Sequence, residues 1–436
     1  MYLIRSTIIQ KHFQRGAANR QGAVIVLVAV LLIAILACTS LCIDIGWASL
    51  SKSELQNAAD SSSAAGAAQL MTNYGAYMSP SQSNPNGLIS SAEASATTYC
   101  VQYAGYNKSG DVSSLKLLSS DIQFGFTDAT GNFQSNSSSY PNTVQVLLRR
   151  DSTANTPLPL FFASIFGTSS LNLSATSSAT TYAGIISSFN PNGGGSGASF
   201  APTPAGTAPS GAYGSWGNSY SSSTNNFNCK LLPLAFDVNE WNMFFSTGMS
   251  PDGTINTDAN NNPQIQVYPS PKNSPGNFGL LCIGPWTNAT PDYEYWVLNG
   301  PRASDLQSLV NAGSFPVSMS TPKPWKGSPG LRSVLSSYFS QIIGQPRLLP
   351  LFQPATVSPY QAASGSGSNT TYAIVGFVGV KVNHVSGSGS NLNISVQPCP
   401  VIDPTAVFDS TTVYPVGAAP ASQLQSFTYL PPMITK

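Results

Sequence analysis

Histidine limits the chemistry that this sequence could perform. The 436 residues contain two histidines, His12 near the start of the chain and His384 far along it. A Ser-His-Asp or Cys-His arrangement beyond the first residues would therefore depend on His384. This residue follows a strand-like run and precedes a Gly/Ser turn, a pattern that is typical of an exposed loop. We find no catalytic constellation and expect a protein that is not an enzyme.

Two pairs of acidic residues have spacings that could suit the cleavage of glycosides. Asp237 and Glu240 form the first pair, and Asp292 and Glu294 form the second. The second pair is interleaved with aromatic residues, as sugar-binding surfaces often are: Tyr293, Tyr295 and Trp296. On a strand, a spacing of two would place both acids on one face, but no opposing carboxylate stands at a defined distance. We interpret the cluster as part of a packed core, with contact to a glycan as the less favoured alternative.

Metal and cofactor sites are not indicated. The chain has no Cys-x-x-Cys pair, and Cys38 and Cys42 lie inside an apolar run. A loop at Gly248–Ala259 imitates the middle of a calcium loop but lacks acids at its first and twelfth positions. The glycine-rich runs lack the Gly-x-x-x-x-Gly-Lys-Ser/Thr pattern of phosphate loops. We expect neither a metal ion nor a cofactor.

The remaining cysteines permit three pairings. They are Cys100, Cys229, Cys282 and Cys399. A bond between Cys229 and Cys399 would join the two ends of the last region of the chain, provided that this region lies in an oxidising compartment. Free buried thiols are the alternative interpretation, because Cys100 falls in a different region.

An uncharged apolar run occupies residues 23–43. At about 1.5 Å per residue it would span roughly 30 Å as a helix, which is enough to cross a bilayer. We predict that this run is a membrane anchor, with side chains in contact with lipid that include Ala23, Leu27, Leu31, Ile35 and Ile43. Basic residues without acidic ones precede the run, so the first residues are expected in the cytoplasm and the bulk of the chain outside.

Three other interpretations of this run remain open. A cleaved secretory signal peptide would have an apolar region of about 7–15 residues, shorter than this one. A lipoprotein signal would place an acylated cysteine at Cys38 and would still tether the chain to a membrane. A prepilin signal would be cleaved after Gly22, but Leu27 stands where such sequences normally have Glu.

Beyond the run, residues 44–72 continue with helix-forming residues and apolar positions spaced three and four apart. The membrane helix is therefore expected to extend as a stalk. Trp47, close to the end of the run, is interpreted as an aromatic residue of the membrane interface.

The overall charge is low and balanced. Only 8% of the residues are charged, and 18 basic against 17 acidic residues give a net charge of +1. A surface without surplus Lys and Arg excludes nucleic acid as the expected partner. An apolar fraction of 42% is ample for folded cores.

The order of these segments resembles the amino-terminal region of TadG-like proteins of the tight-adherence (Flp) pilus assembly group. The resemblance rests on Gln21-Gly22-Ala23, the apolar run, Ile43-Asp44-Ile45-Gly46 and Glu54-Leu-Gln-Asn-Ala-Ala-Asp60, followed by an Ala/Ser/Gly run. Further stretches at 121–125, 141–149, 157–167 and 171–175 are similar in order to the region that follows the anchor in such proteins. The resemblance covers residues 15–185. The metal pattern Asp-x-Ser-x-Ser of larger relatives is absent, so their metal site is not implied.

The predicted fold class is α+β. It combines a transmembrane helix extended as a stalk, a small α+β domain with an antiparallel sheet that includes a short apolar helix at Pro157–Phe166, and a mainly β distal domain. The expected divisions are a basic tail (1–21), a transmembrane helix (22–43), a stalk (44–72), an α+β ectodomain (84–185), a Gly/Ser/Pro linker (186–226) and a carboxy-terminal ectodomain (227–436).

The resemblance implies a structural role without a cofactor. The expected protein is a single-pass protein of the bacterial inner membrane, with a cytoplasmic amino terminus, that supports assembly or anchoring of a Flp-type pilus. Its expected partners are pilus or secretion-system proteins. The alternative is a membrane-tethered adhesin or glycan-binding surface protein.

Overall fold

The computed structural model describes residues 3–78, 84–135, 139–191, 229–250, 253–259, 261–268, 279–284, 290–327, 334–353, 370–387, 392–418, 426–430 and 432–435. The chain divides into two compact units. Unit 1 comprises Met1–Ala59, Tyr103–Leu118 and Leu147–Thr176, and unit 2 comprises Asp60–Gln102, Ser119–Val146 and Ser177–Lys436. The α+β fold class is confirmed, because helices and antiparallel sheets both occur and the last part of the chain is mostly strand.

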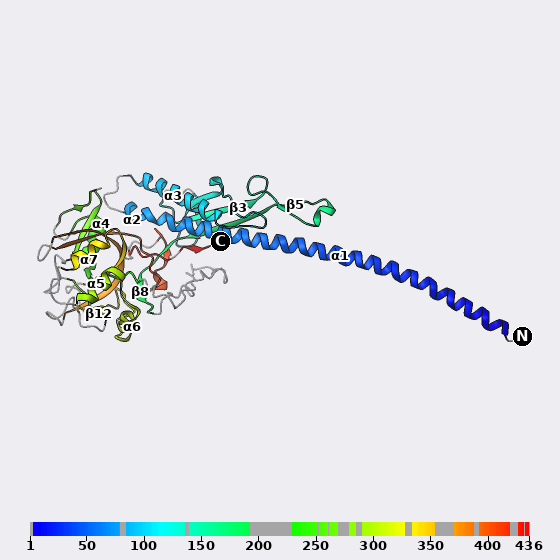
Figure 1. The fold of residues 1–436 in the computed structure, drawn as a ribbon. Coiled ribbons are helices and arrows are strands. Elements are labelled where there is room, and N and C mark those ends of the chain that lie inside the picture. Colours follow the sequence, from blue (N-terminus) through cyan, green and yellow to red (C-terminus); the bar gives the residue numbers. More distant parts are fainter. Residues whose placement is uncertain are drawn as a thin grey trace. The chain divides into compact units, whose positions relative to one another are not determined.

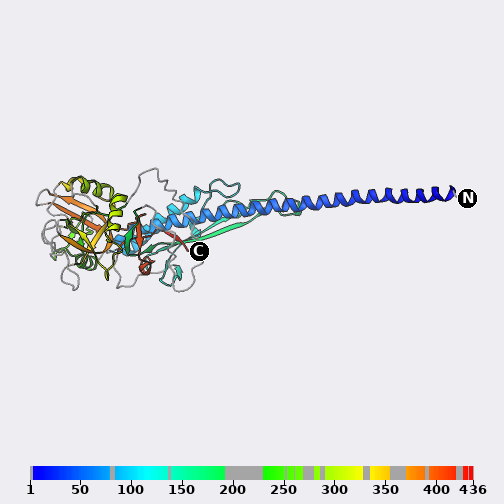
Figure 2. The same cartoon turned by 90° about the horizontal axis from the view of Figure 1, so that it is seen from below.

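A single continuous helix, α1 (Leu3–Leu70), contains the apolar run (Figures 1 and 2). By length and composition it includes a stretch that could cross a membrane. Ala23 lies in this helix, and the side chains of the other anchor residues are well exposed: Leu27, Leu31, Ile35 and Ile43. Exposed apolar side chains on an isolated stretch of helix are what a bilayer would cover.

Unit 1 holds a hairpin beside α1. Strand β4 (Leu158–Pro159) pairs antiparallel with β5 (Ser170–Leu171), and the short 3₁₀ helix η3 (Ala163–Phe166) forms the tip between them. Figures 1 and 2 show this hairpin alongside α1. The sequence predicted a short apolar helix over Pro157–Phe166, and this prediction is wrong except for the single turn of η3.

Unit 2 contains most of a five-stranded sheet in the order β18-β6-β3-β1-β2. Its strands are β1 (Ile122–Thr127), β2 (Phe133–Ser135), β3 (Thr143–Arg150), β6 (Leu173–Thr180) and β18 (Met433–Ile434), of which β3 and β6 continue into unit 1. The end of α1, η1 (Met71–Asn73), α2 (Tyr74–Tyr77) and α3 (Pro85–Gly105) lie along the chain before it. A Cβ atom at Gly66 would overlap the Cys100 sulfur, so α1 and α3 approach closely there.

A seven-stranded sheet is centred on the long strand β14 (Thr371–Ser386). Its strands follow the order β10 (Asn256–Thr257), β11 (Pro263–Tyr268), β15 (Asn393–Pro398), β14, β13 (Pro346–Phe352) and β9 (Phe236–Asp237). Strand β12 (Lys323–Lys326) also pairs with β14. Four helices accompany it: α4 (Val238–Thr247), α5 (Thr290–Asn299), α6 (Ala303–Asn311) and α7 (Leu335–Gln341).

Two small sheets join early and late segments of unit 2. Strand β8 (Ile186–Phe189) pairs with β16 (Ala406–Phe408), and β7 (Tyr182–Ala183) pairs with β17 (Tyr414–Pro415), which follows η6 (Ser410–Thr412). Of the linker expected at 186–226, the first residues form β8, and residues 192–226 lie outside the described part of the chain. The expected domain ranges stay predictions.

Candidate functional site

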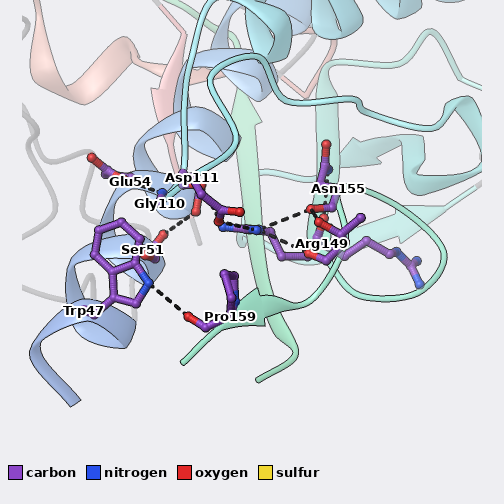
Figure 3. Close-up of polar contacts among 11 residues, drawn as sticks. Trp47, Ser51, Glu54, Gly110, Asp111, Arg149, Asn155 and Pro159 are labelled. Atoms are coloured by element: carbon purple, nitrogen blue, oxygen red, sulfur yellow. Dashed lines mark hydrogen bonds and ion pairs between the residues drawn. The ribbon is translucent and has the colours of Figure 1, made fainter. Parts of the chain in front are cut away.

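The turns of α1 just past the apolar run carry polar side chains that bind other segments of unit 1. We call this set of contacts the α1 junction. It comprises Asp44, Trp47, Ser51 and Glu54 on α1 with their partners in residues 108–111 and 150–163. Figure 3 shows part of it, with Ser51 and Glu54 beside the loop that bears Gly110 and Asp111, and Trp47 directed toward Pro159.

Asp44 holds the hairpin tip by its backbone. Its carboxylate accepts hydrogen bonds from the backbone N–H groups of Phe161 (2.8 Å), Phe162 (3.0 Å) and Ala163 (2.6 Å). The side chain is buried. Desolvation would raise the pKa of Asp44, but the three N–H donors outweigh it and lower this pKa below its usual range. A charged carboxylate is therefore favoured at this position.

Trp47 reinforces the same contact one turn further along α1. Its indole N–H donates to the carbonyl of Pro159 at 3.2 Å (Figure 3), and its ring lies 5.7 Å from that of Phe161. Positions 44 and 47 share a helix face because three residues make almost one turn. The side chain that the sequence assigned to the membrane interface thus also fixes the hairpin.

Glu54 and Ser51 bind the loop after α3. Glu54 accepts from the backbone N–H of Gly110 at 2.7 Å and pairs with Lys108 at 3.1 Å, while the Ser109 hydroxyl donates to the Ser51 carbonyl at 2.7 Å. Gly110 has a φ of +58°, and a Cβ atom there would lie 2.8 Å from Ser51 and from the guanidinium of Arg150. Only glycine allows this close approach at a positive φ without strain.

Arg150, at the end of β3, is fully buried and supplies the centre of the junction. Its guanidinium donates to the Asp111 carboxylate at 2.7 Å, to the Ser109 carbonyl at 2.8 Å and to the carbonyls of Asn155 and Thr156 at 3.3 and 3.2 Å. A buried cation is tolerated only with such a full set of acceptors. The neighbouring Arg149 points away from this network in Figure 3.

The turn after β3 presents two of those acceptors. Asn155 and Thr156 have φ values of +63° and +53°, a conformation that costs free energy for residues other than glycine. The Asn155 side chain offsets the cost, because it donates to the carbonyls of Lys116 and Arg149, both at 2.9 Å, and accepts from the Lys116 N–H at 2.7 Å. The turn is thus held in the shape that faces Arg150.

The α1 junction has the chemistry of an attachment point. Its charged groups are paired with one another or with backbone groups. Within the described ranges, no three His, Cys, Asp or Glu side chains gather closely enough to hold a metal ion. His384 is exposed and lies in β14 rather than in a loop.

The two acidic pairs proposed from the sequence are built into helices. Asp237 is the N-cap of α4 and accepts from the Asn239 N–H at 2.8 Å. Asp292 and Glu294 lie on α5, not on a strand, so the expected shared face does not exist. Of the aromatic residues between and beside them, Tyr293 and Trp296 are fully buried, so they pack in the core. The predicted strand is therefore wrong, but the burial of these two rings agrees with the packing that the sequence favoured. Glycan contact stays a prediction.

The cysteines beyond the apolar run are free thiols in the structure. Cys100, Cys229 and Cys282 are buried, and Cys399 is half-buried. Burial raises the pKa of Cys100 to about 12. Burial also raises the pKa of the Cys399 thiol, and the charges of Lys381 and Lys230 partly oppose this rise. The bond between Cys229 and Cys399 stays a prediction.

An aromatic cavity of about 210 Å³ lies in unit 2. Tyr74, Tyr77 and Tyr140 line it together with Phe427 and Tyr429, and the Tyr77 and Tyr140 rings lie 4.8 Å apart. Desolvation and the neighbouring Tyr77 raise the pKa of Tyr74 to about 12. The cavity is smaller than the roughly 300–1,000 Å³ of most ligand pockets. It therefore supports no assignment of a substrate.

Sequence reasoning found the helix that carries the α1 junction but not the junction itself. Asp44, Glu54 and Gly110 are separated in the chain from their partners, and Arg150 falls one residue past the stretch 141–149 that the sequence singled out. One signal was available: an Asp directly after an apolar run is costly near a membrane unless it is paired.

Comparison with protein families gives one match within the chain. The model described as "Putative Flp pilus-assembly TadE/G-like" matches residues 22–69. Neither the comparison with curated proteins nor that with solved structures finds a match. The matched segment contains the apolar run and the α1 side of the junction, Asp44 to Glu54. Residues 22–69 are thus similar to a TadE/G-like segment of Flp pilus assembly, which confirms the resemblance inferred from the sequence for these residues. The resemblance inferred for the stretches from residue 121 onward stays a prediction.

Proposed function

We propose that this chain is a non-enzymatic, single-pass envelope protein that supports assembly or anchoring of a Flp-type pilus. In this proposal α1 crosses the inner membrane over residues 22–43, with the basic tail in the cytoplasm. The rest of the chain is extracytoplasmic and offers surfaces to pilus or secretion-system proteins.

The observation that carries the proposal is where the family match falls. It begins beside Ala23 at the start of the apolar run and ends one residue before α1 does, at Leu70. The feature shared with the family is therefore the anchor together with the helix that leaves it. A match confined to this helix favours a tether over a chemical activity.

Charge bias supports the orientation. Arg5, Lys11, Arg15 and Arg20 precede the run, and no acidic residue does, whereas acidic residues begin at Asp44. Basic residues flanking a membrane helix are retained in the cytoplasm. An outside location would also let Cys229 and Cys399 form the predicted bond, which peptide mapping without reductant would detect.

A deletion and rescue experiment tests the proposal. Cells that lack the chain should lose assembled Flp-type pili, and the full chain should restore them. The matched control replaces residues 1–43 with a cleavable signal peptide, so that the same ectodomain is exported without an anchor. It should not restore pili, because the proposed role requires the tether.

Two outcomes would contradict the proposal. If the exported, unanchored ectodomain restores pili fully, the anchor is not part of the function. If the deletion leaves pili intact but abolishes adherence to surfaces, the adhesin alternative is correct. Phosphatase and green-fluorescent reporters fused after Asp60 test orientation separately, and only the phosphatase should be active.

A further inference from the structure

The tip of the β4–β5 hairpin exposes apolar side chains. Phe161, Phe162, Ile165 and Phe166 have 59%, 37%, 78% and 73% of their surfaces exposed. No charged residue occurs from Pro157 to Leu171. Clusters of exposed large apolar side chains in folded proteins mark contact surfaces, because leaving them in water is unfavourable.

The α1 junction fixes this tip at the end of the apolar run. Asp44 follows Ile43 directly and binds the backbone of residues 161–163, and Trp47 binds Pro159. If α1 crosses the bilayer over residues 22–43, the tip stands where α1 enters the membrane interface. At the same level of α1, Ile43 and Ile45 on either side of Asp44 also expose apolar side chains.

Backbone N–H groups of the tip are hydrogen-bonded within the protein, which suits an apolar surrounding. Besides the three N–H groups bound by Asp44, that of Leu160 donates to the Ser169 carbonyl, and those of Gly167 and Thr168 donate to carbonyls within η3. Backbone groups that are paired internally can enter lipid without the cost of losing water. The Asp44 charge is likewise satisfied by its donors.

We propose that the hairpin tip, residues 160–168, is a second membrane contact that seats in the outer interface of the bilayer crossed by α1. It rests on the proposed function only in requiring that α1 spans the membrane. The tip and α1 together would hold unit 1 by two points, so that α1 could not rotate freely about its axis beneath the junction. Lipid, not a second protein, is the occupant.

Photo-crosslinking of the full chain tests this contact. A benzophenone amino acid, p-benzoyl-phenylalanine, replaces Phe166 in one variant, Leu31 in a second and Tyr106 in a third. Each is reconstituted in phosphatidylethanolamine–phosphatidylglycerol vesicles that carry a radiolabelled phospholipid. Leu31 reports the span. Tyr106 is an aromatic control in unit 1 that is 69% exposed. It lies two residues before Lys108, the partner of Glu54, about 15 Å along α1 from Asp44 at 1.5 Å per residue.

The expected result is lipid labelling at Leu31 and Phe166, with labelling at Tyr106 at least five-fold weaker. Labelling at Leu31 but only background at Phe166 overturns the second contact and leaves the anchor intact. Crosslinks from Phe166 to another protein chain in native membranes, in place of lipid, also overturn it. Absence of lipid labelling at Leu31 would instead refute the spanning helix on which the proposed function rests.

An Asp44→Ala variant adds a second measurement. If the Asp44 carboxylate sets the depth of the tip, lipid labelling from position 166 should fall by at least three-fold while labelling from position 31 is unchanged. Unchanged labelling at position 166 would contradict the proposed positioning of the tip.

Discussion

The α1 junction in unit 1 and the aromatic core beside β14 in unit 2 are stabilised in different ways. The junction is a polar network around Arg150 and Asp44, in which charged side chains bind backbone groups. The core is built from aromatic rings in edge-to-face and tilted contact: the Trp325 ring centroid lies 5.5 Å from that of Phe315 and 5.9 Å from that of Phe377. Each region has contributions from segments distant in sequence, but the interactions differ.

The difference follows from the kind of group that each region buries. The β14 region removes large apolar side chains from water, which is non-directional and tolerates many sequences. The junction joins irregular loops to a helix, and buried backbone groups there need partners in defined directions. We therefore expect the stability of the core to fall when side-chain volume is removed. We expect the stability of the junction to fall when hydrogen-bond donors are removed or when pH changes the charge of Asp44.

Trp325→Ala should have the largest effect. The ring is buried, and its N–H donates to the Ser314 carbonyl at 3.2 Å. Removing it should lower the free energy of unfolding of unit 2 by about 3–5 kcal/mol. Hydrogen exchange of peptides from β12 and β14 in the detergent-solubilised chain measures this. Trp325→Phe should cost clearly less, and equal losses for the two variants would mean that ring volume is not what stabilises the core.

Arg150→Leu should disturb the junction by less, about 1.5–3 kcal/mol, because it removes hydrogen bonds from a charged donor to buried carbonyls. The matched control is Arg149→Leu in the same strand. Arg149 is partly exposed and pairs with Asp151 at 3.8 Å, so its loss should cost less than about 1 kcal/mol.

Hydrogen exchange in residues 106–116 and 150–156 would separate the two arginine variants. Faster exchange only in Arg150→Leu is the expected result. Equal changes in both variants would show that the buried network contributes nothing beyond net charge.

Acidification should give the smallest effect and opposite signs in the two units. The pKa of Asp44 is lowered in the folded chain, so its stabilising contribution is present above the ordinary value of 3.8 and is lost as pH falls through the folded value. The pKa of Asp403 in unit 2 is raised by desolvation, against hydrogen bonds from Lys230 and Thr405. Its contribution is full below 3.8 and is lost as pH rises through its folded pKa.

Exchange rates corrected for intrinsic pH dependence, measured from pH 6 to pH 3, test this contrast. Amides of residues 161–163 should lose protection toward pH 3, and those of residues 230 and 405 should gain it. Asp44→Asn should remove the dependence at 161–163. A parallel loss of protection at both places would contradict the assignment of opposite shifts.

Regular elements with a clear period were predictable from the sequence. The helix over residues 23–70 and the strands near 122–127, 143–150, 371–386 and 393–398 have local patterns that match the structure. In these segments the local pattern of apolar residues favours the same helix or strand that the structure contains.

Helices α4 and α5 were not predicted, because their acidic and aromatic residues were interpreted as candidate sites. In α4, Asp237 followed three residues later by Glu240 is a helix-start signal, and Gly248 with a φ of +73° ends the helix. In α5, Tyr293, Trp296 and Val297 recur at the three- and four-residue spacing of a buried helix face. The periodic signal was present in both and was outweighed by the acidic and aromatic composition.

By itself, the sequence determined the apolar run, its flanking charges, the continuing helix and the family that these resemble, because each depends on residues close together in the chain. Only the tertiary structure decided that residues 157–166 form part of the β4–β5 hairpin instead of a helix. The N–H groups of residues 161–163 bind the carboxylate of Asp44, more than a hundred positions earlier, and not carbonyls four residues back. A choice between two sets of hydrogen bonds is settled by the partner that folding brings near, and no local pattern contains that partner.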